Sequence, residues 1–154
     1  MVFAKTGGKR LRSARGAGIL PRMQQALTDI AKKHGIVLAL KFGSSVTGQV
    51  HPGSDVDLAI LLDRSHVTLH EHGELLQSLQ PLFPDRELDL ALINHADPLF
   101  LKKITDTCEL LYGPPERLQA LKLYAFKRYQ DHRRFFEMER EFAKRFLATA
   151  RANR

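Results

Sequence analysis

Residues 36–62 read IVLALKFGSSVTGQVHPGSDVDLAILL, and this stretch decides the fold. The aliphatic run over residues 36–42 ends at Gly43, which predicts a buried strand that enters a tight turn. Residues 56–62 are apolar apart from Asp57 and predict a second buried strand. An ionised carboxylate is costly in such a strand unless it is paired or binds a metal, so Asp57 is a candidate functional residue.

Three carboxylates form the candidate cluster. Asp55 and Asp57 are two residues apart at the start of the second strand, so their side chains leave the same face about 7 Å apart. Asp89 lies in a further predicted strand, residues 87–93, where acids and alanine alternate with leucines that form a buried face. Carboxylate oxygens are ligands that Mg²⁺ prefers. If the strands are neighbours, all three carboxylates can converge on one or two cations.

The turn after the first strand is a candidate phosphate site. Gly43 lets the backbone approach a phosphate closely, and the amides of the following turn, with the Ser44 hydroxyl, can donate to phosphate oxygens. A short helix is predicted to begin near Ser45. A glycine-serine turn alone is also typical of a purely structural connection, so its weight comes from its spacing to the carboxylates.

Taken together, Gly43-Ser44, ten residues over 45–54, Asp55-Val56-Asp57 and a later Asp89 resemble the signature of the DNA polymerase β-like nucleotidyltransferase superfamily. The resemblance covers residues 36–93. The short chain is similar to the minimal nucleotidyltransferases that act as antitoxins of HEPN toxins in bacteria and archaea. It implies an α+β fold, in which a small mixed β-sheet packs against helices and a long helical segment follows at the C-terminus.

The resemblance also implies roles for these residues. Gly43 and Ser44 would hold the triphosphate of ATP, while Asp55, Asp57 and Asp89 would be catalytic and would ligate two Mg²⁺ ions. Asp89 would also help to activate the acceptor hydroxyl. The implied function is Mg²⁺-dependent transfer of AMP to a protein hydroxyl, a tyrosine of a cognate HEPN toxin, by which the chain acts as an antitoxin.

Two other functions stay open, as do the base preference and the oligomeric state. The chain could be a non-catalytic antitoxin that binds and occludes its toxin, or it could transfer AMP to a small molecule such as an aminoglycoside. One position departs from the pattern of the family, since Thr47 stands where many relatives carry a basic residue. Lys41, Arg64 or a residue of the terminal helix could then neutralise the triphosphate.

The rest of the chain gives a consistent outline. Residues 1–18 are predicted to form a basic, disordered arm, and residues 19–154 a single domain. Helices are predicted over residues 21–35, 66–79, 97–104 and 116–150, and a further strand over residues 108–112. On the last helix the expected apolar contacts are Leu118, Leu121, Phe126, Tyr129, Phe135, Phe136, Phe142 and Phe146.

Charge and composition restrict the partners. The net charge is +7, and residues 116–154 carry eleven basic and five acidic side chains, which suits a polyphosphate or an acidic partner. Aromatic residues among these cations could stack on bases, but on a helix we expect them to pack against the core or a subunit rather than bind nucleic acid.

No apolar run approaches the roughly 18 residues of a membrane span, so a cytoplasmic location is expected. The seven histidines are interpreted as surface residues.

Overall fold

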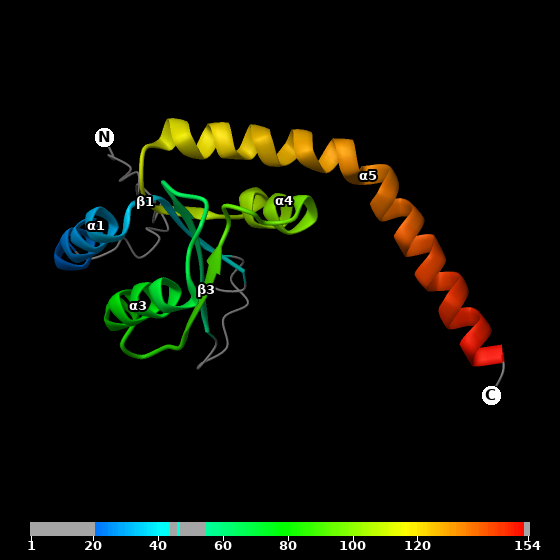
Figure 1. Ribbon diagram of the computed structural model, residues 1–154, viewed down its shortest axis with the longest axis horizontal. Helices are drawn as coiled ribbons and strands as arrows, with labels where there is room; N and C mark the ends of the chain where they lie inside the picture. The colour runs from blue at the N-terminus through cyan, green and yellow to red at the C-terminus, as the bar shows by residue number, and fades with distance from the viewer. Residues whose placement is uncertain (1–20, 44–45, 47–54, 153–154) are drawn as a thin grey trace, which may run out of the picture.

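A four-stranded mixed sheet organises the chain, with helices on both of its faces (Figure 1). The computed structural model describes residues 21–43, residue 46 and residues 55–152. The predicted arm over residues 1–18, Ser44 and the helix expected near Ser45 lie outside this description, apart from one helical residue at Val46. The elements are α1 (Pro21–His34), β1 (Ile36–Phe42), β2 (Val56–Leu62), α3 (Leu69–Leu79), the 3₁₀ turn η1 (Gln80–Leu82), β3 (Leu88–Leu92), α4 (Pro98–Asp106), β4 (Glu109–Tyr112) and α5 (Pro115–Ala152). The α+β class is therefore confirmed.

The strand order is β3-β2-β1-β4, with β1 antiparallel to both β2 and β4 and with β3 parallel to β2. The two central strands are apolar on both faces because helices cover both sides of the sheet. In β1, Leu38, Ala39 and Leu40 are fully buried, and in β2 the same holds for Leu58, Ala59 and Ile60. These runs fix the register that positions the candidate site.

Alternate residues of the strands belong to two separate cores. On one face, Leu58 and Ile60 pack with residues of α1 and α3. On the other face, Ala59 packs with Leu101 and Ile104 of α4 and with the beginning of α5. Asp57 is in phase with Ala59, so its side chain leaves the sheet on the face that α4 and α5 cover.

Two helix starts follow from capping residues. The α3 helix begins at Leu69 rather than near residue 66, because Thr68 accepts a hydrogen bond from the Glu71 N–H while the Glu71 carboxylate accepts from the Thr68 N–H at 2.7 Å. The α4 helix begins at Pro98, one residue after its predicted start, because the Asp97 carboxylate caps the first free amides.

The terminal helix differs from its prediction in what it contacts. The α5 helix is continuous over 38 residues, a length of about 57 Å at 1.5 Å per residue. Only its beginning is buried, through Leu118, Leu121 and Ala125, and the rest runs away from the sheet (Figure 1). Of the expected contacts with the core or a subunit, Phe126, Phe135, Phe142 and Phe146 make none with the core, since these side chains are between 48% and 72% exposed, and contact with a subunit stays a prediction. None of the described helices is long and apolar enough to cross a membrane.

His34 is also an exception to its prediction, since it is buried at the end of α1 rather than exposed. Its Nε2 lies 3.1 Å from the Ser78 hydroxyl of α3, and its carbonyl accepts a hydrogen bond of 2.8 Å from Arg64. Burial is the main cause that lowers the pKa of His34 below its ordinary value of 6.5, and the charge of Lys33 contributes. The ring is therefore held in its neutral form between the two helices.

We expect this histidine to make the fold weaker in mild acid. The unfolded chain binds a proton on His34 near pH 6.5, whereas the folded chain resists it, so the free energy of unfolding should fall as the pH drops below 6.5. Urea unfolding at pH 7.0 and pH 5.5 should show a smaller loss for His34→Gln than for the unmodified chain. An equal loss in both would show that His34 does not contribute to the pH dependence.

Candidate active site

The candidate site lies at the edge of the sheet where β1 ends and where β2 and β3 begin. In the strand register, Asp57 is the partner of Phe42 in β1 and of Asp89 in β3. Residues that are direct partners in adjacent strands point to the same face, and neighbouring strands are about 4.8 Å apart. The sheet therefore places Asp57 and Asp89 side by side, because the two strands are neighbours.

The electrostatics of Asp57 are consistent with this placement. Its side chain is half-buried, and the loss of solvent raises the pKa of its carboxyl group above the ordinary value. The negative charges of Asp89 and then Asp55 raise the same pKa further. Three carboxylates thus share one region in which negative charge is unfavourable, and a bound cation would relieve this repulsion.

Gly43 faces this group of carboxylates directly. Its φ of +72° lies in the left-handed region, and a Cβ at this position would overlap the Asp57 carboxylate, with only 2.9 Å to Cγ. The Val46 N–H donates to the Gly43 carbonyl at 3.2 Å, which begins a helical turn. The turn predicted to hold phosphate therefore meets the carboxylates, while Ser44 falls in a part of the chain that is not described.

The three carboxylates offer the oxygen ligands that Mg²⁺ prefers, although their side chains do not converge on one point. Asp55 and Asp89 are exposed, and their carboxylate oxygens are the hard ligands that Mg²⁺ takes. Within residues 21–43, 46 and 55–152, no three His, Cys, Asp or Glu side chains converge closely enough to hold a metal as they stand. Register places Asp57 beside Asp89, and the charges of Asp89 and Asp55 both act on Asp57, so the three aspartates are neighbours whose like charges repel one another.

Arg64 and Lys41 were candidates to neutralise the triphosphate, and they lie in different parts of the sheet. Arg64 follows the far end of β2, where it donates to the His34 carbonyl and to Glu71, so of the three candidates it is one that does not reach this site. Lys41 is nearer, but it alternates with Phe42 onto the opposite face of the sheet, and its Nζ lies 4.0 Å from Glu109. Neither cation faces Asp57.

One contact between aromatic side chains at the site could not be predicted from the sequence. The Phe42 ring meets the Phe100 ring of α4 edge to face, with 6.0 Å between centroids and 80° between planes. This contact joins α4 to the last residue of β1, next to Gly43. The start signal of Asp97 and Pro98 predicted α4 but could not show which of its side chains reaches the site.

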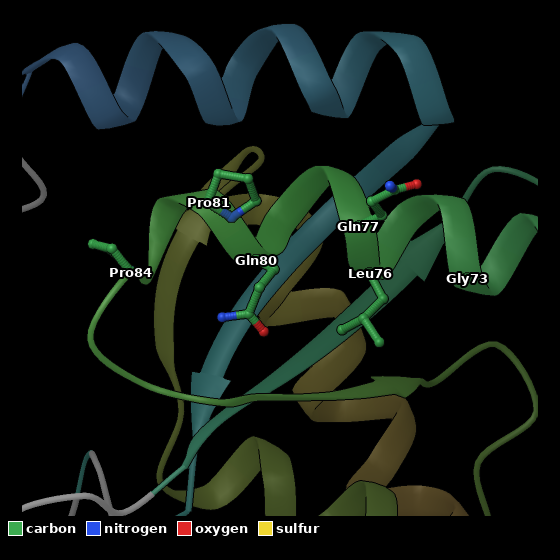
Figure 2. Close-up of a pocket in the computed structure, with 6 residues that line it drawn as sticks. All are labelled: Gly73, Leu76, Gln77, Gln80, Pro81 and Pro84. Atoms are coloured by element: carbon green, nitrogen blue, oxygen red, sulfur yellow. The ribbon is translucent and has the colours of Figure 1, made fainter.

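A surface pocket of about 470 Å³ lies elsewhere, against α3 and η1 (Figure 2). None of its lining residues is ionisable, and α3 covers the face of the sheet opposite to Asp57. It has no group that could act on a phosphate. The pocket is lined by Gly73, Leu76, Gln77, Gln80, Pro81 and Pro84.

The family of the chain follows from sequence comparison. The family model described as polymerase beta, nucleotidyltransferase matches residues 25–117, which is more than half of the chain and includes β1 to β4. The chain therefore belongs to the polymerase beta nucleotidyltransferase family. The resemblance that the sequence suggested is confirmed at this level. No curated protein matches the sequence significantly.

Solved structures with the same fold include chains of toxin–antitoxin complexes. One such complex, determined with AMP-PNP, has a chain that is 20% identical, with a TM-score of 0.64 over 81% of this chain and 98% of that chain. A complex of the tri-AMPylated Shewanella oneidensis HEPN toxin with its MNT antitoxin gives 17% identity and a TM-score of 0.59 over 82% and 97%. A MntA–HepT complex gives 17% and 0.59 over 84% and 99%. At these identities the likeness establishes a shared fold.

Proposed function

We propose that the chain is a Mg²⁺-dependent nucleotidyltransferase that transfers AMP from ATP to a protein hydroxyl, specifically a tyrosine of a cognate HEPN-type toxin. The observation that carries this proposal is the register of Asp57 against Asp89 beside the left-handed turn at Gly43. This arrangement supplies carboxylates and a close backbone approach at one edge of the sheet. Both are needed to hold a metal-bound triphosphate.

Each residue has a distinct part in this proposal. Asp55 and Asp57 would hold two Mg²⁺ ions, and Asp89 would complete one of the two sites. Bound Mg²⁺ supplies charge neutralisation of the triphosphate and a lower pKa of the acceptor hydroxyl. Gly43 keeps the turn against the carboxylates, so that its backbone and the Ser44 hydroxyl can contact the phosphates. Asp89 is exposed on the edge strand, where its carboxylate can accept the proton of an incoming hydroxyl.

The choice of a protein acceptor is supported by what surrounds the site. The described residues contain one sheet with its covering helices, and the pocket of Figure 2 is remote from Asp57 and lacks charged groups that could orient a cationic small molecule. Proteins of the same fold occur in complexes with HEPN toxins, one of them AMPylated. The exposed α5 gives this chain a large surface that a protein could contact.

A labelling experiment tests the proposal. The chain is incubated with Mg²⁺, ATP labelled at the α-phosphate and a HEPN-type toxin, taken from the neighbouring gene if that gene encodes one, with spectinomycin as a parallel acceptor. We expect label on the toxin only, and peptide mass spectrometry should locate it on a tyrosine. Label on spectinomycin with an unlabelled toxin would overturn the protein acceptor and favour the small-molecule alternative.

A binding antitoxin without catalysis is the second candidate, because α5 offers an exposed surface that does not depend on the carboxylates. The two candidates differ in cells that express the toxin. If transfer is the function, Asp55→Asn and Asp57→Asn should both abolish protection against the toxin. Full protection by both variants would instead assign the function to binding alone.

A further inference from the structure

The part of α5 beyond its last buried residue, Ala125, forms a projecting arm, which we call the α5 arm and define as residues 126–149. Figure 1 shows that it passes beyond α4 and leaves the rest of the structure. All its side chains are exposed except for a few near its beginning that are half-buried. Because most of this helix packs on nothing in the described structure, its regular structure needs another reason.

An apolar stripe follows the arm at helical spacing. The face that buries Leu118, Leu121 and Ala125 against the body continues past the body with the same three- and four-residue steps. Aromatic rings stack along it, with centroids 6.0 Å apart for Tyr129 and Phe136 and 6.5 Å for Phe142 and Phe146. The members of the stripe are Tyr129, Phe135, Phe136, Phe142, Phe146 and Leu147.

The stripe is too apolar to be an ordinary solvated face. Phe135, Phe142 and Phe146 are each more than 60% exposed. Burying such a side chain removes its apolar surface from water and stabilises a complex, and contiguous exposed patches of this kind mark interaction sites. The stripe therefore has the character of one half of a helix-in-groove interface.

The charge of the arm indicates which kind of partner can bind the stripe. The arm carries seven Lys or Arg and four Asp or Glu, so a second copy of the chain would bring the same excess of positive charge. A nucleic acid fits poorly because the rings stack on one another, and because Arg133 is paired with Glu137 at 2.9 Å and Lys144 with Glu141 at 3.0 Å. A protein groove that is apolar in its centre and acidic at its rim complements both features.

The beginning of the arm adjoins the candidate active site through α4. A hollow of about 300 Å³ lies between α4 and α5, lined by Leu99, Lys102, Lys103, Asp106 and Tyr129. Lys102 lies over the Tyr129 ring at 5.9 Å, and Leu99 is 49% exposed. The next residue, Phe100, contacts Phe42 beside Gly43. A partner seated on the arm and this hollow would therefore lie near the carboxylates.

We propose that the α5 arm is the docking surface for the acceptor protein, which binds it through an apolar groove with an acidic rim. This inference rests on the proposed function in one respect, namely that the acceptor is a protein. Docking and transfer are then separate properties of the chain. The arm supplies affinity, and the edge of the sheet supplies chemistry.

The test uses the chain of residues 1–154 and a purified HEPN-type toxin, taken from the neighbouring gene if that gene encodes one, with binding measured by calorimetry in the absence of ATP. The arm variant combines Phe142→Gln and Phe146→Gln, which are exposed and keep a good helix former at each position. The matched control is Leu123→Gln, an exposed apolar residue that lies before the arm and on the face of α5 opposite to Leu121 and Ala125. We expect the arm variant to weaken binding at least about 10-fold and the control to bind like the unmodified chain.

The remaining outcomes separate the two proposals. In transfer assays the arm variant should raise KM for the toxin and keep kcat. Unchanged binding by the arm variant, or no binding by the unmodified chain, would overturn the docking surface. A dimer in light scattering that the arm variant dissociates would assign the stripe to a second copy, and loss of single-stranded RNA binding would assign it to nucleic acid. A toxin that binds through the arm but is never labelled would refute the transferase proposal alone.

Discussion

Asp57→Asn should lower AMP transfer at least about 100-fold while the protein remains folded. Asp57 lies at the centre of the candidate site, beside Asp89 in the register and against Gly43 in the turn. An amide of the same size loses one anionic ligand, and the loss of a direct ligand costs more than the 10- to 100-fold that is typical of residues behind the ligands. Steady-state transfer at saturating ATP and Mg²⁺ measures this effect.

The same substitution should make the fold slightly more stable without Mg²⁺. Desolvation and the charges of Asp89 and Asp55 raise the pKa of Asp57, so its ionised form destabilises the folded state at neutral pH and protonation relieves this as the pH falls. The asparagine carries no charge at any of these pH values. Because the carboxyl is only half-buried, solvent screening limits the gain to a few tenths of a kcal/mol.

A matched control separates site chemistry from surface charge. Asp29 is an exposed aspartate on α1, where it accepts a hydrogen bond from Gln25 at 3.1 Å, and α1 covers the face of the sheet opposite to Asp57. Asp29→Asn should leave transfer unchanged. Added Mg²⁺ should raise the melting temperature of the unmodified chain and of the Asp29 variant, but not of the Asp57 variant. A fully active Asp57→Asn protein would refute the role of this carboxylate.

Gly43→Ala should cause the second large effect, in both activity and stability. The left-handed conformation costs an alanine about 1–2 kcal/mol, and the new methyl group would also overlap the Asp57 carboxylate. For a chain of this size, 1 kcal/mol lowers the melting temperature by about 2–4 °C, so we expect a decrease of several degrees. Displacement of either the turn or the carboxylate should also reduce transfer at least about 10-fold.

Gly73→Ala is the control for this substitution. Gly73 is exposed within α3, and a Cβ there would meet nothing within 4 Å. The alanine should stabilise the helix by about 0.5–1 kcal/mol and leave transfer unchanged. Thermal unfolding and transfer assays on both variants form the comparison. A Gly43 variant as stable and active as the Gly73 variant would show that the turn does not need its left-handed residue.

Much of the fold could be predicted because local patterns and tertiary contacts agree in the sheet. The alternation of Leu88 and Leu90 with Asp89 predicted a strand with one buried face, and Leu88 and Leu90 are buried while Asp89 is exposed. The predicted start of α3 was less accurate, because the capping residue Thr68 lies inside the apolar pattern from which the helix was predicted. The environment of the aromatic residues of α5 could not be predicted, since apolar spacing indicates a face that becomes buried but cannot tell whether its own domain or a partner supplies the cover.

Only part of the candidate site could be predicted from the sequence. The spacing of Asp55 and Asp57 placed both carboxylates on one side of a strand, and only the parallel pairing of β2 with β3 was needed to add Asp89. The source of positive charge was not accessible, because Arg64 follows β2 in sequence but lies at its far end. The link from Phe42 to Phe100 depends on how α4 crosses the sheet, and no short-range pattern encodes that angle.

The parallel pairing of β2 and β3 also determines where the chain can tolerate insertions and deletions during evolution. Loops before and after β3 can gain or lose residues at little cost, since they change neither the register nor the phase of the strand. A single insertion inside Leu88–Leu92 would turn the acid at position 89 to the opposite face and would expose a leucine in its place. Lineages of this domain should therefore vary in length around β3 and keep an uninterrupted pairing from Val56 with Leu88 to Ile60 with Leu92.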